Sequence, residues 1–269
     1  MYSLIVILIY LLIYINAAFA ETIRFAPLPI HEKNILISHY KYLIKHLEDT
    51  TNLKIELLYI EDYRKLMEEF KKGNVHLITI SPLLYYELKK EFPRVKIIAH
   101  FKERDGSIDL SCALITHAKG PNSLKEVKGP VAVGQKLSTC GYFAANIMLS
   151  QAGKSINKMK IKYFNTHNEI AEAVIREEFE IGSLRKDIAE QYKGFAIKIL
   201  KVIKMGPSLS VAINPLVVSE PNIKKIQEAL LSFNPLDKKD EFIGKYGLTK
   251  GREESFNIIK KYEKFKPKF

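Results

Sequence analysis

Apolar positions along this chain follow two periods, and segments with one period alternate with segments with the other. Compact apolar and β-branched runs predict strands, whereas one helix face is indicated by the spacing of Leu36, Tyr40, Leu43, Ile44 and Leu47. Strands are predicted at residues 22–26, 54–60, 75–80, 95–101, 108–116, 159–164, 180–184, 195–203 and 209–213, and at Val131. Repeated strand–helix–strand order is typical of an α/β fold in which helices cover mostly parallel sheets.

Small and polar residues mark where several helices begin and end. Asp62 is placed to cap a helix that Gly73 ends, and Pro82 suits the first turn of the next helix. Residues 123–126 and 166–169 read Ser-Leu-Lys-Glu and Thr-His-Asn-Glu, and both sequences are capping boxes. We therefore expect a short helix at the first box and a longer helix at the second.

The strand–helix pattern restarts once, which predicts two lobes. Residues 21–107 would form the first lobe and residues 108–204 the second. Residues 205–269 are mainly helical after one short strand, so we expect the chain to return to the first lobe and complete it. Two strands, near 108–115 and 199–203, would then join the lobes as a hinge.

The start of the chain is typical of an export signal. The first twenty residues contain no Lys, Arg, Asp or Glu, and residues 18–20 read Ala-Phe-Ala, which fits the rule for signal cleavage. A membrane anchor is the alternative, but a span needs about 20 apolar residues and this run is shorter. We expect residues 1–20 to be a signal peptide cleaved after Ala20, and the mature chain to be periplasmic.

The chain has two cysteines, Cys112 and Cys140, and a formal net charge of +12. Two cysteines do not form a disulfide framework, and we interpret them as two buried thiols in preference to one bridge. Lysines are spread through nearly every segment, so the charge favours attraction of small anions over binding of nucleic acid. The histidines are scattered without metal-ligand spacing, and we expect neither a metal nor a cofactor.

One loop carries the chemistry that the sequence shows best. Ser138-Thr139-Cys140-Gly141 lies between the strand at Val131 and an apolar segment of helical length. Such a loop directs unpaired backbone N–H groups and the positive end of a helix dipole at one point, which attracts an anion. His167 begins the helix that follows the next strand. The alternative interpretation is that Ser138 and Thr139 are helix caps only and His167 is a surface histidine.

Several motifs in the chain resemble those of the periplasmic phosphonate-binding proteins of ABC importers, which have the type II periplasmic-binding fold. The resemblance covers most of the chain up to about Val218. The motifs that carry it are Pro27-Leu-Pro29, Tyr63-Arg-Lys-Leu66, Lys72-Gly-Asn-Val75, Ser81-Pro-Leu-Leu-Tyr85, Leu137-Ser-Thr-Cys-Gly141 and Thr166-His167. In that family a helix start rich in Ser and Thr cradles the oxyanion and a histidine hydrogen-bonds it. By similarity these roles fall on Ser138, Thr139 and His167, with Gly141 allowing close backbone approach.

The resemblance also implies that Ser81 and Tyr85 close over the ligand from the first lobe. Two positions depart from the family pattern. Cys140 stands where the family usually has a serine, and Arg185 stands where relatives that bind amino-phosphonates often place an acid. Because an arginine repels an ammonium, the second departure implies phosphate, phosphite or a phosphonate with an uncharged tail. A thiol at a helix start has a lowered pKa, so capture of arsenite by Cys140 is an alternative.

Taken with the resemblance, the residues predict a monomeric solute-binding protein that closes two lobes around a phosphonate, phosphite or phosphate and delivers it to an ABC permease. An alternative is a sensor in which the same closure is read by a membrane histidine kinase. Ser138 and His167 imitate a nucleophile and its base, but the loop lacks a strained nucleophile turn between glycines. We therefore expect no enzyme.

Overall fold

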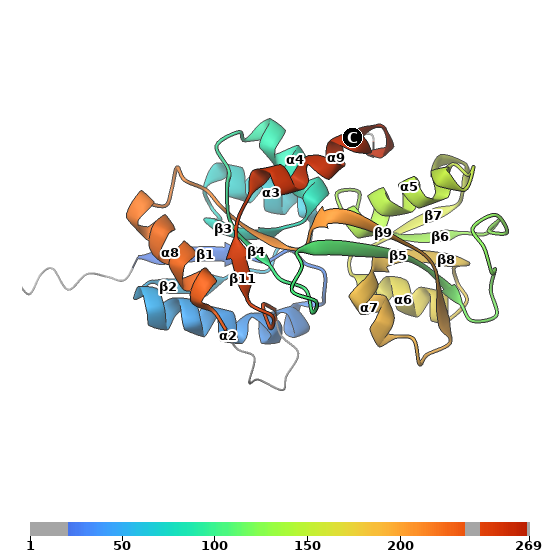
Figure 1. The fold of residues 1–269 in the computed structure, drawn as a ribbon, viewed down its shortest axis with the longest axis horizontal. Helices are drawn as coiled ribbons and strands as arrows, with labels where there is room; N and C mark the ends of the chain where they lie inside the picture. Colours follow the sequence, from blue (N-terminus) through green and yellow to red (C-terminus); the bar gives the residue numbers. More distant parts are fainter. Residues whose placement is uncertain (1–20, 235–242, 268–269) are drawn as a thin grey trace, which may run out of the picture.

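The computed structural model describes residues 21–234 and 243–267, so the predicted signal peptide lies outside the described residues. The strands form two mixed sheets, one in each lobe, and helices flank both sheets (Figure 1). The two-lobed α/β architecture predicted from the sequence is therefore confirmed. No helix in the described ranges is long and apolar enough to cross a membrane.

The first sheet has six strands in the order β11-β4-β10-β3-β1-β2. Their bounds are β1 Thr22–Ala26, β2 Lys54–Leu57, β3 Leu77–Ile80, β4 Lys96–Phe101, β10 Ser210–Ile213 and β11 Leu248–Lys250. Four helices flank it: α2 Lys33–Thr51, α3 Tyr63–Lys72, α4 Pro82–Glu91 and α8 Glu220–Ser232. Strand β1 runs parallel to β2 and β3, whereas β10 runs antiparallel between β3 and β4. In Figure 1, α2 lies below the sheet and α3 and α4 lie above it, and α8 packs against α2.

The second sheet has five strands in the order β7-β6-β8-β5-β9. Their bounds are β5 Asp109–His117, β6 Val131–Gly134, β7 Ile161–Phe164, β8 Ile181–Arg185 and β9 Ile197–Pro207. The flanking helices are a π-helical turn, η1 Thr139–Phe143, that continues into α5 Ala144–Gln151, with α6 His167–Ile175 and α7 Lys186–Gln191. Figure 1 shows α5 on one face of this sheet and α6 and α7 on the other. Separate apolar clusters fill these two faces.

The chain passes from the first sheet to the second between β4 and β5, and returns between β9 and β10. Strands β5 and β9 pair along most of their length, as the predicted hinge requires. The C-terminal helix α9, Ile258–Lys261, contacts both α4 and β9, and the Asn146 side chain donates to the Phe265 carbonyl at 2.8 Å. The C-terminal segment thus touches both lobes. The lobe boundaries at 107 and 204 stay a prediction.

Most predicted helix boundaries are confirmed by specific bonds. The Asp62 side chain accepts the Lys65 N–H at 2.7 Å, and Gly73 ends α3 with a φ of 79°. At α6, both reciprocal bonds of the capping box between Thr166 and Glu169 are present. These bonds fix the first residues of α3 and α6, which both face the other lobe.

Two predicted elements are wrong. Residues 123–126 form only a turn, because the Glu126 carboxylate accepts both the Ser123 hydroxyl and the Asn122 N–H, and Pro130 follows shortly after. The C-terminal region also contains β11, which the sequence analysis took as part of a helical stretch. Three residues are too few to show a period, and β11 forms by pairing with the edge of β4.

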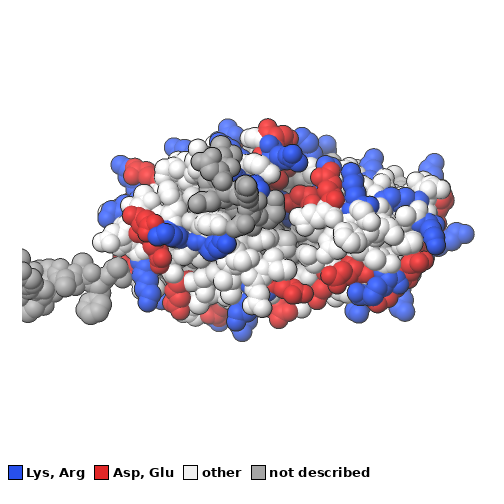
Figure 2. Space-filling view, turned by 90° about the horizontal axis from the view of Figure 1, so that it is seen from below, with Lys and Arg blue, Asp and Glu red and all other residues white. Residues whose placement is uncertain are grey.

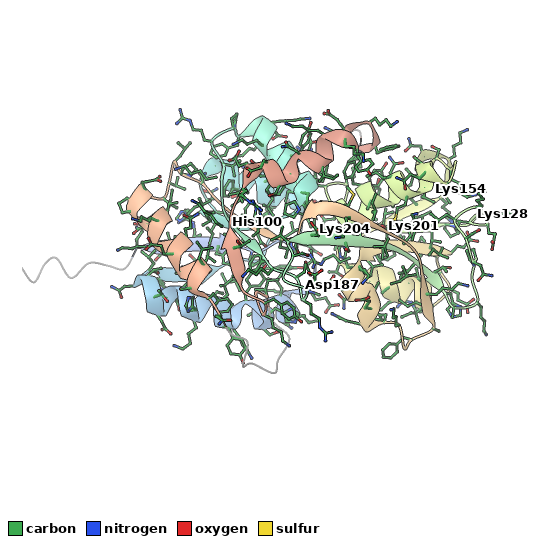
Figure 3. All side chains as sticks on the ribbon, in the orientation of Figure 1. His100, Lys128, Lys154, Asp187, Lys201 and Lys204 are labelled. Carbon is green, nitrogen blue, oxygen red and sulfur yellow. A yellow bond between two sulfur atoms is a disulfide. The ribbon has the colours of Figure 1, made fainter. Side chains whose placement is uncertain are left out.

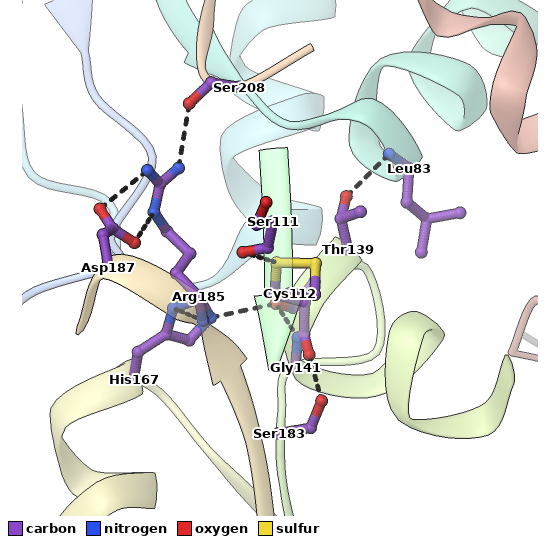
Figure 4. The surroundings of a disulfide bond; sticks show 12 residues. Leu83, Ser111, Cys112, Thr139, Gly141, His167, Ser183, Arg185, Asp187 and Ser208 are labelled. Atoms are coloured by element: carbon purple, nitrogen blue, oxygen red, sulfur yellow. Dashed lines mark hydrogen bonds and ion pairs between the residues drawn. A yellow bond between two sulfur atoms is a disulfide. The ribbon is translucent and has the colours of Figure 1, made fainter. Parts of the chain in front are cut away.

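Cys112 and Cys140 form a disulfide with a Cα–Cα distance of 4.9 Å (Figure 4). The interpretation as two thiols was wrong, because folding brings the turn at Thr139–Phe143 against β5 across a separation of 28 residues. Neither cysteine is free. The hypothesis of a reactive Cys140 thiolate that captures arsenite therefore loses the thiol on which it depended.

Positive charge is distributed as the sequence indicated. On the face shown in Figure 2, Lys and Arg alternate with Asp and Glu over both lobes. In the second lobe, Lys201 and Lys204 lie along β9, whereas Lys128 and Lys154 lie at the far end (Figure 3). On the face shown in Figure 2, the charge forms no continuous basic patch of the kind that a nucleic-acid backbone requires.

Candidate oxyanion-binding site

A small cavity of about 20 Å³ lies between the lobes where four helices begin. Tyr63 and His167 are the first residues of α3 and α6, and Ser81 and Ser138 directly precede α4 and η1. The cavity is lined by Leu28, Ile30, Tyr63, Ser81, Leu110, Ser138, Thr139, Cys140, His167, Arg185 and Leu209. Each helix start carries roughly half a positive charge from the helix dipole. Four such ends, two from each lobe, make the cavity electropositive.

The Ser81 hydroxyl is the one buried side-chain polar atom in the described residues that has no hydrogen-bond partner. Ser81 is 6% exposed and stands at the N-cap of α4, where a serine normally accepts a backbone N–H of its own helix. Here the Leu83 N–H is instead capped by the Thr139 hydroxyl of the other lobe, at 2.9 Å (Figure 4). The Ser81 hydroxyl is thereby left unpaired at the cavity wall.

The loop from Ser138 to Gly141, which we call the oxyanion loop, presents hydroxyl groups that can still donate a hydrogen bond. Ser138 Oγ accepts the Gly141 N–H at 2.9 Å, as Thr139 Oγ1 accepts the Leu83 N–H. A hydroxyl that accepts a bond retains its proton for another acceptor. The Tyr63 hydroxyl is hydrogen-bonded to Ser138, and burial raises the Tyr63 pKa, so this phenol stays protonated.

Gly141 is required by packing within the second lobe. A Cβ at this position would lie 2.4 Å from the Gly134 Cα, so any other residue would push the turn away from β6. The close backbone approach predicted for Gly141 is therefore made with Gly134. The Cys140 carbonyl accepts the Ser183 hydroxyl at 2.5 Å, which places the loop against β8 as well (Figure 4).

His167 is buried, with 4% exposure, and its tautomer is set by the backbone. The Arg185 N–H donates to His167 Nδ1 at 3.3 Å, so Nε2 carries the proton, and Nε2 lies 3.5 Å from Ser138 Oγ. Burial, followed by the positive charge of Arg185, lowers the pKa of His167 to about 3. His167 is thus a neutral hydrogen-bond donor at the cavity.

Arg185 ends β8, and four of the five N–H groups of its guanidinium donate to other residues of the protein. Nε and Nη2 each lie 2.9 Å from an Asp187 oxygen, while Nη1 and Nη2 reach Ser208 at 3.2 Å and Glu103 at 3.1 Å. Burial opposes the charge, but Asp187 and Glu103 outweigh it and raise the Arg185 pKa further above its usual value. Asp187 lies where the lobes meet (Figure 3), and Glu103 and Ser208 reach Arg185 from the connections between the lobes.

A second cavity, of about 130 Å³, adjoins the first, which we call the inner cavity. The two cavities share Ile30, Arg185 and Leu209. The second cavity is the larger of the two, and its walls carry the carboxylates of Glu103 and Asp187 beside the cations Lys102, Arg185 and Lys245. Among the described residues no carboxylate lines the inner cavity, which presents hydroxyls and an imidazole N–H. The inner cavity is therefore the candidate site for an anion.

Seven of the eight residues predicted for the site lie at or beside the inner cavity: Ser81, Ser138, Thr139, Cys140, His167 and Arg185 line it, and Gly141 supports it. Tyr85 does not line it. Its ring packs against Phe256 with centroids 4.1 Å apart, and the residue is 4% exposed. Tyr63 supplies the phenol at the cavity instead. Tyr63 was not among the residues predicted for the site, although it begins the Tyr63-Arg-Lys-Leu66 motif and directly follows the Asp62 cap.

The lobes are in contact around the site. Gln135 of the second lobe accepts the Tyr63 N–H at 2.9 Å and donates to the Glu61 carbonyl at 2.7 Å. With the bonds from Thr139 and Arg185, these contacts describe a closed arrangement. A cavity of about 20 Å³ has room for roughly one water molecule. In this closed arrangement the cavity is therefore smaller than a tetrahedral oxyanion.

A family model described as the phosphonate periplasmic substrate-binding protein of ABC transporters matches residues 25–254. Among curated proteins, a stretch of 67 residues is 37% identical to the phosphate-import protein PhnD of Mycolicibacterium smegmatis. That stretch is 25% of this chain and covers 21% of the relative's length, about a fifth. The shared stretch alone therefore does not carry that relative's activity over to this chain.

Two solved structures have the same fold. PhnD1 from Prochlorococcus marinus, in complex with methylphosphonate, matches with a TM-score of 0.79 at 14% identity, over 91% of this chain and 97% of that one. A binding-protein component of an ABC phosphonate transporter from Pseudomonas aeruginosa matches with a TM-score of 0.78 at 15% identity, over 92% and 87%. These likenesses confirm the periplasmic-binding fold. Because the family model spans most of the residues, the chain belongs to the periplasmic substrate-binding proteins of phosphonate ABC transporters.

Proposed function

We propose that this chain captures a phosphonate, phosphite or phosphate in the inner cavity and presents it, enclosed between the lobes, to an ABC permease. The observation that carries the proposal is the unpaired Ser81 hydroxyl at a point where four helices begin. A buried polar atom without a partner costs about 1–3 kcal/mol, and an oxyanion would supply the missing acceptor. The same proposal includes removal of residues 1–20 and a monomeric, periplasmic product.

The binding free energy must come mainly from direct hydrogen bonds. Micromolar affinity corresponds to about 8 kcal/mol, whereas one helix dipole contributes about 0.3–1 kcal/mol. At these typical values, four dipoles supply about 1–4 kcal/mol, which is half of that amount or less. Hydrogen bonds to a charged group contribute about 1.5–3 kcal/mol each, so Tyr63, Ser81, Ser138 and His167 are sufficient to provide the remainder.

The walls of the cavity favour a small group on phosphorus. Leu28, Ile30, Leu110 and Leu209 line it beside the donors. An apolar wall accepts a P–H or P–CH₃ group without leaving a polar atom unpaired. Within the proposed class, phosphite and methylphosphonate thus match both the donors and the apolar wall.

The surroundings of Arg185 favour a ligand without an amine. Asp187 and Glu103 line the adjoining cavity, and both are already paired with the Arg185 guanidinium. The Arg185 guanidinium therefore already pairs with the carboxylates that an ammonium group of a ligand would need. An amino-phosphonate would have to bring a second positive charge beside it.

The proposal is tested with a ligand panel. Oxidised mature protein is titrated calorimetrically with phosphate, phosphite, methylphosphonate, aminoethylphosphonate, sulfate and arsenite, and its thermal stability is measured with each. We expect binding of the first three and weaker binding of aminoethylphosphonate. If no phosphorus oxyanion binds or raises the melting temperature, the proposal is wrong.

A further inference from the structure

A disulfide joins the oxyanion loop to one of the two paired strands that connect the lobes. We propose that the Cys112–Cys140 disulfide positions the loop for ligand binding, so that its reduction weakens capture of the oxyanion. The inference rests on the proposed function. The inference goes beyond the proposed function because it makes ligand affinity depend on whether the disulfide is oxidised or reduced, although the disulfide itself donates no hydrogen bond to the ligand.

The bond is buried in the second lobe, beside the inner cavity. Cys112 is fully buried in β5, between Arg185 on β8 and Ile203 on β9 in the sheet register. Cys140 is 2% exposed and lies within the π-helical turn, directly after Ser138 and Thr139. One covalent link therefore ties the donors of the loop to the strand that leads into the second lobe (Figure 4).

The disulfide is the covalent tie between the turn and β5. The N–H groups of Tyr142 and Phe143 both reach the Ser138 carbonyl at 3.3 Å, beyond the usual range for a backbone bond. A π-helical turn is rare and is found mostly at functional sites. The other ties are the Gly141 N–H on Ser138 Oγ and the Leu83 N–H on Thr139 Oγ1, both at 2.9 Å, the Ser183 hydroxyl on the Cys140 carbonyl, and the contact of Gly141 with Gly134. None of these bonds reaches β5, so the disulfide holds the turn against that strand.

A shift of the turn would act directly on the ligand. Ser138 and Thr139 are the neighbours of Cys140, and their hydroxyls converge on a cavity of about 20 Å³ with Tyr63 and His167. Donors that are held in place in advance lose less free energy when the ligand binds. The disulfide thus contributes to affinity through pre-organisation, apart from its contribution to folding.

The coupling must work in both directions. Cys140 lines the cavity between the lobes, so separation of the lobes exposes the disulfide and closure on a ligand covers it. If reduction weakens binding, then bound ligand must by linkage disfavour reduction to the same extent. Dithiothreitol breaks the Sγ–Sγ bond by supplying two electrons and two protons, which gives two thiols and cyclic oxidised dithiothreitol.

Three forms of the mature protein test the inference: the oxidised protein, the protein reduced by dithiothreitol, and the Cys112→Ser/Cys140→Ser variant. Titration with methylphosphonate, phosphite and phosphate gives the affinities, circular dichroism gives the folded fraction, and thiol titration gives the redox state. We expect the folded, disulfide-free forms to bind about tenfold more weakly or worse, a loss of about 1.4 kcal/mol. Dithiothreitol should leave the double variant unchanged, which controls for effects of the reductant elsewhere.

Equal affinity with and without the disulfide would overturn the inference and leave the bond with a structural role only. If the double variant does not fold, the equilibrium between the oxidised and reduced natural protein in a dithiothreitol redox buffer decides the matter, with and without saturating methylphosphonate. A shift of this equilibrium towards the disulfide form in the presence of ligand supports the inference, and an unchanged equilibrium overturns it. Failure of the oxidised protein to bind any of the three anions would instead refute the proposed function, and this inference with it.

Discussion

The Ser81→Ala variant should raise stability and lower affinity at the same time. Ser81 is 6% exposed and its hydroxyl has no partner, so the unliganded protein carries a desolvation cost of about 1–3 kcal/mol that alanine removes. In the complex the same hydroxyl would donate a charge-assisted bond of about 1.5–3 kcal/mol, and its loss corresponds to roughly 10- to 150-fold weaker binding. A serine that only packs is not expected to raise stability and lower ligand affinity when it is replaced by alanine.

Two measurements on the same variant check this prediction. Urea denaturation without ligand should show a higher free energy of unfolding, and calorimetric titration with methylphosphonate should show a higher dissociation constant. Ser210→Ala is a matched control, because Ser210 is fully buried but its hydroxyl lies 2.7 Å from His100 Nδ1. His100 lies in the first lobe, in β4 (Figure 3). The control should lose stability and keep its affinity.

The reasoning would be refuted by a Ser81→Ala variant that is less stable without ligand, since the hydroxyl must then have a partner in the empty protein. It would equally be refuted by unchanged affinity for each phosphorus oxyanion that the natural protein binds. Either result would remove the observation on which the proposed site depends.

Three further predictions concern the same cavity. Replacing Ser138 and Thr139 together with alanine should weaken oxyanion binding by roughly a hundredfold or more, since two hydrogen bonds of about 1.5–3 kcal/mol each are lost. The far-ultraviolet circular dichroism should be retained. Unchanged affinity in calorimetry would contradict the assignment of the loop. The Arg185→Ala variant should gain affinity for aminoethylphosphonate relative to methylphosphonate, because two carboxylates are released, and an unaltered ranking in competition titrations would contradict it. Burial lowers the pKa of His31 to about 4 and that of His167 to about 3, from 6.5, so the unfolded chain binds more protons below pH 6.5. Stability should therefore be complete above pH 6.5 and fall towards pH 4, by up to about 1.4 kcal/mol per pH unit for each histidine; denaturation curves that do not change across this range would contradict the neutral imidazoles.

Local signals in the sequence were enough to predict much of the fold. The strand at Thr22–Ala26 and the caps at Asp62 and Thr166 involve only residues close together in the chain, and the structure has them as predicted. The strand at Leu248–Lys250 was missed because it forms by pairing with β4, which is distant in sequence. A three-residue strand has no periodic pattern of its own.

The candidate site was predictable where one segment supplies the chemistry. The loop from Ser138 to Gly141 and the helix start at His167 each follow a strand, and the ends of neighbouring strands meet at one edge of a sheet. The partners of Arg185 and the pairing of Cys112 with Cys140 join segments that only the tertiary structure brings together. Those contacts decide whether the Arg185 charge is free to pair with a ligand and whether Cys140 is a thiol. The spacing of residues in the sequence does not predict them.

The hydrogen bonds of Gln135 to Tyr63 and Glu61 join the two lobes beside the candidate site. They involve only protein groups, so they favour the closed arrangement, and a closed protein cannot take up a ligand. A protein that is shut for roughly nine-tenths of the time binds about tenfold more weakly than its receptive form. Substitution of Gln135 would therefore change the apparent affinity for the ligand without altering any of the hydrogen-bond donors proposed to bind it.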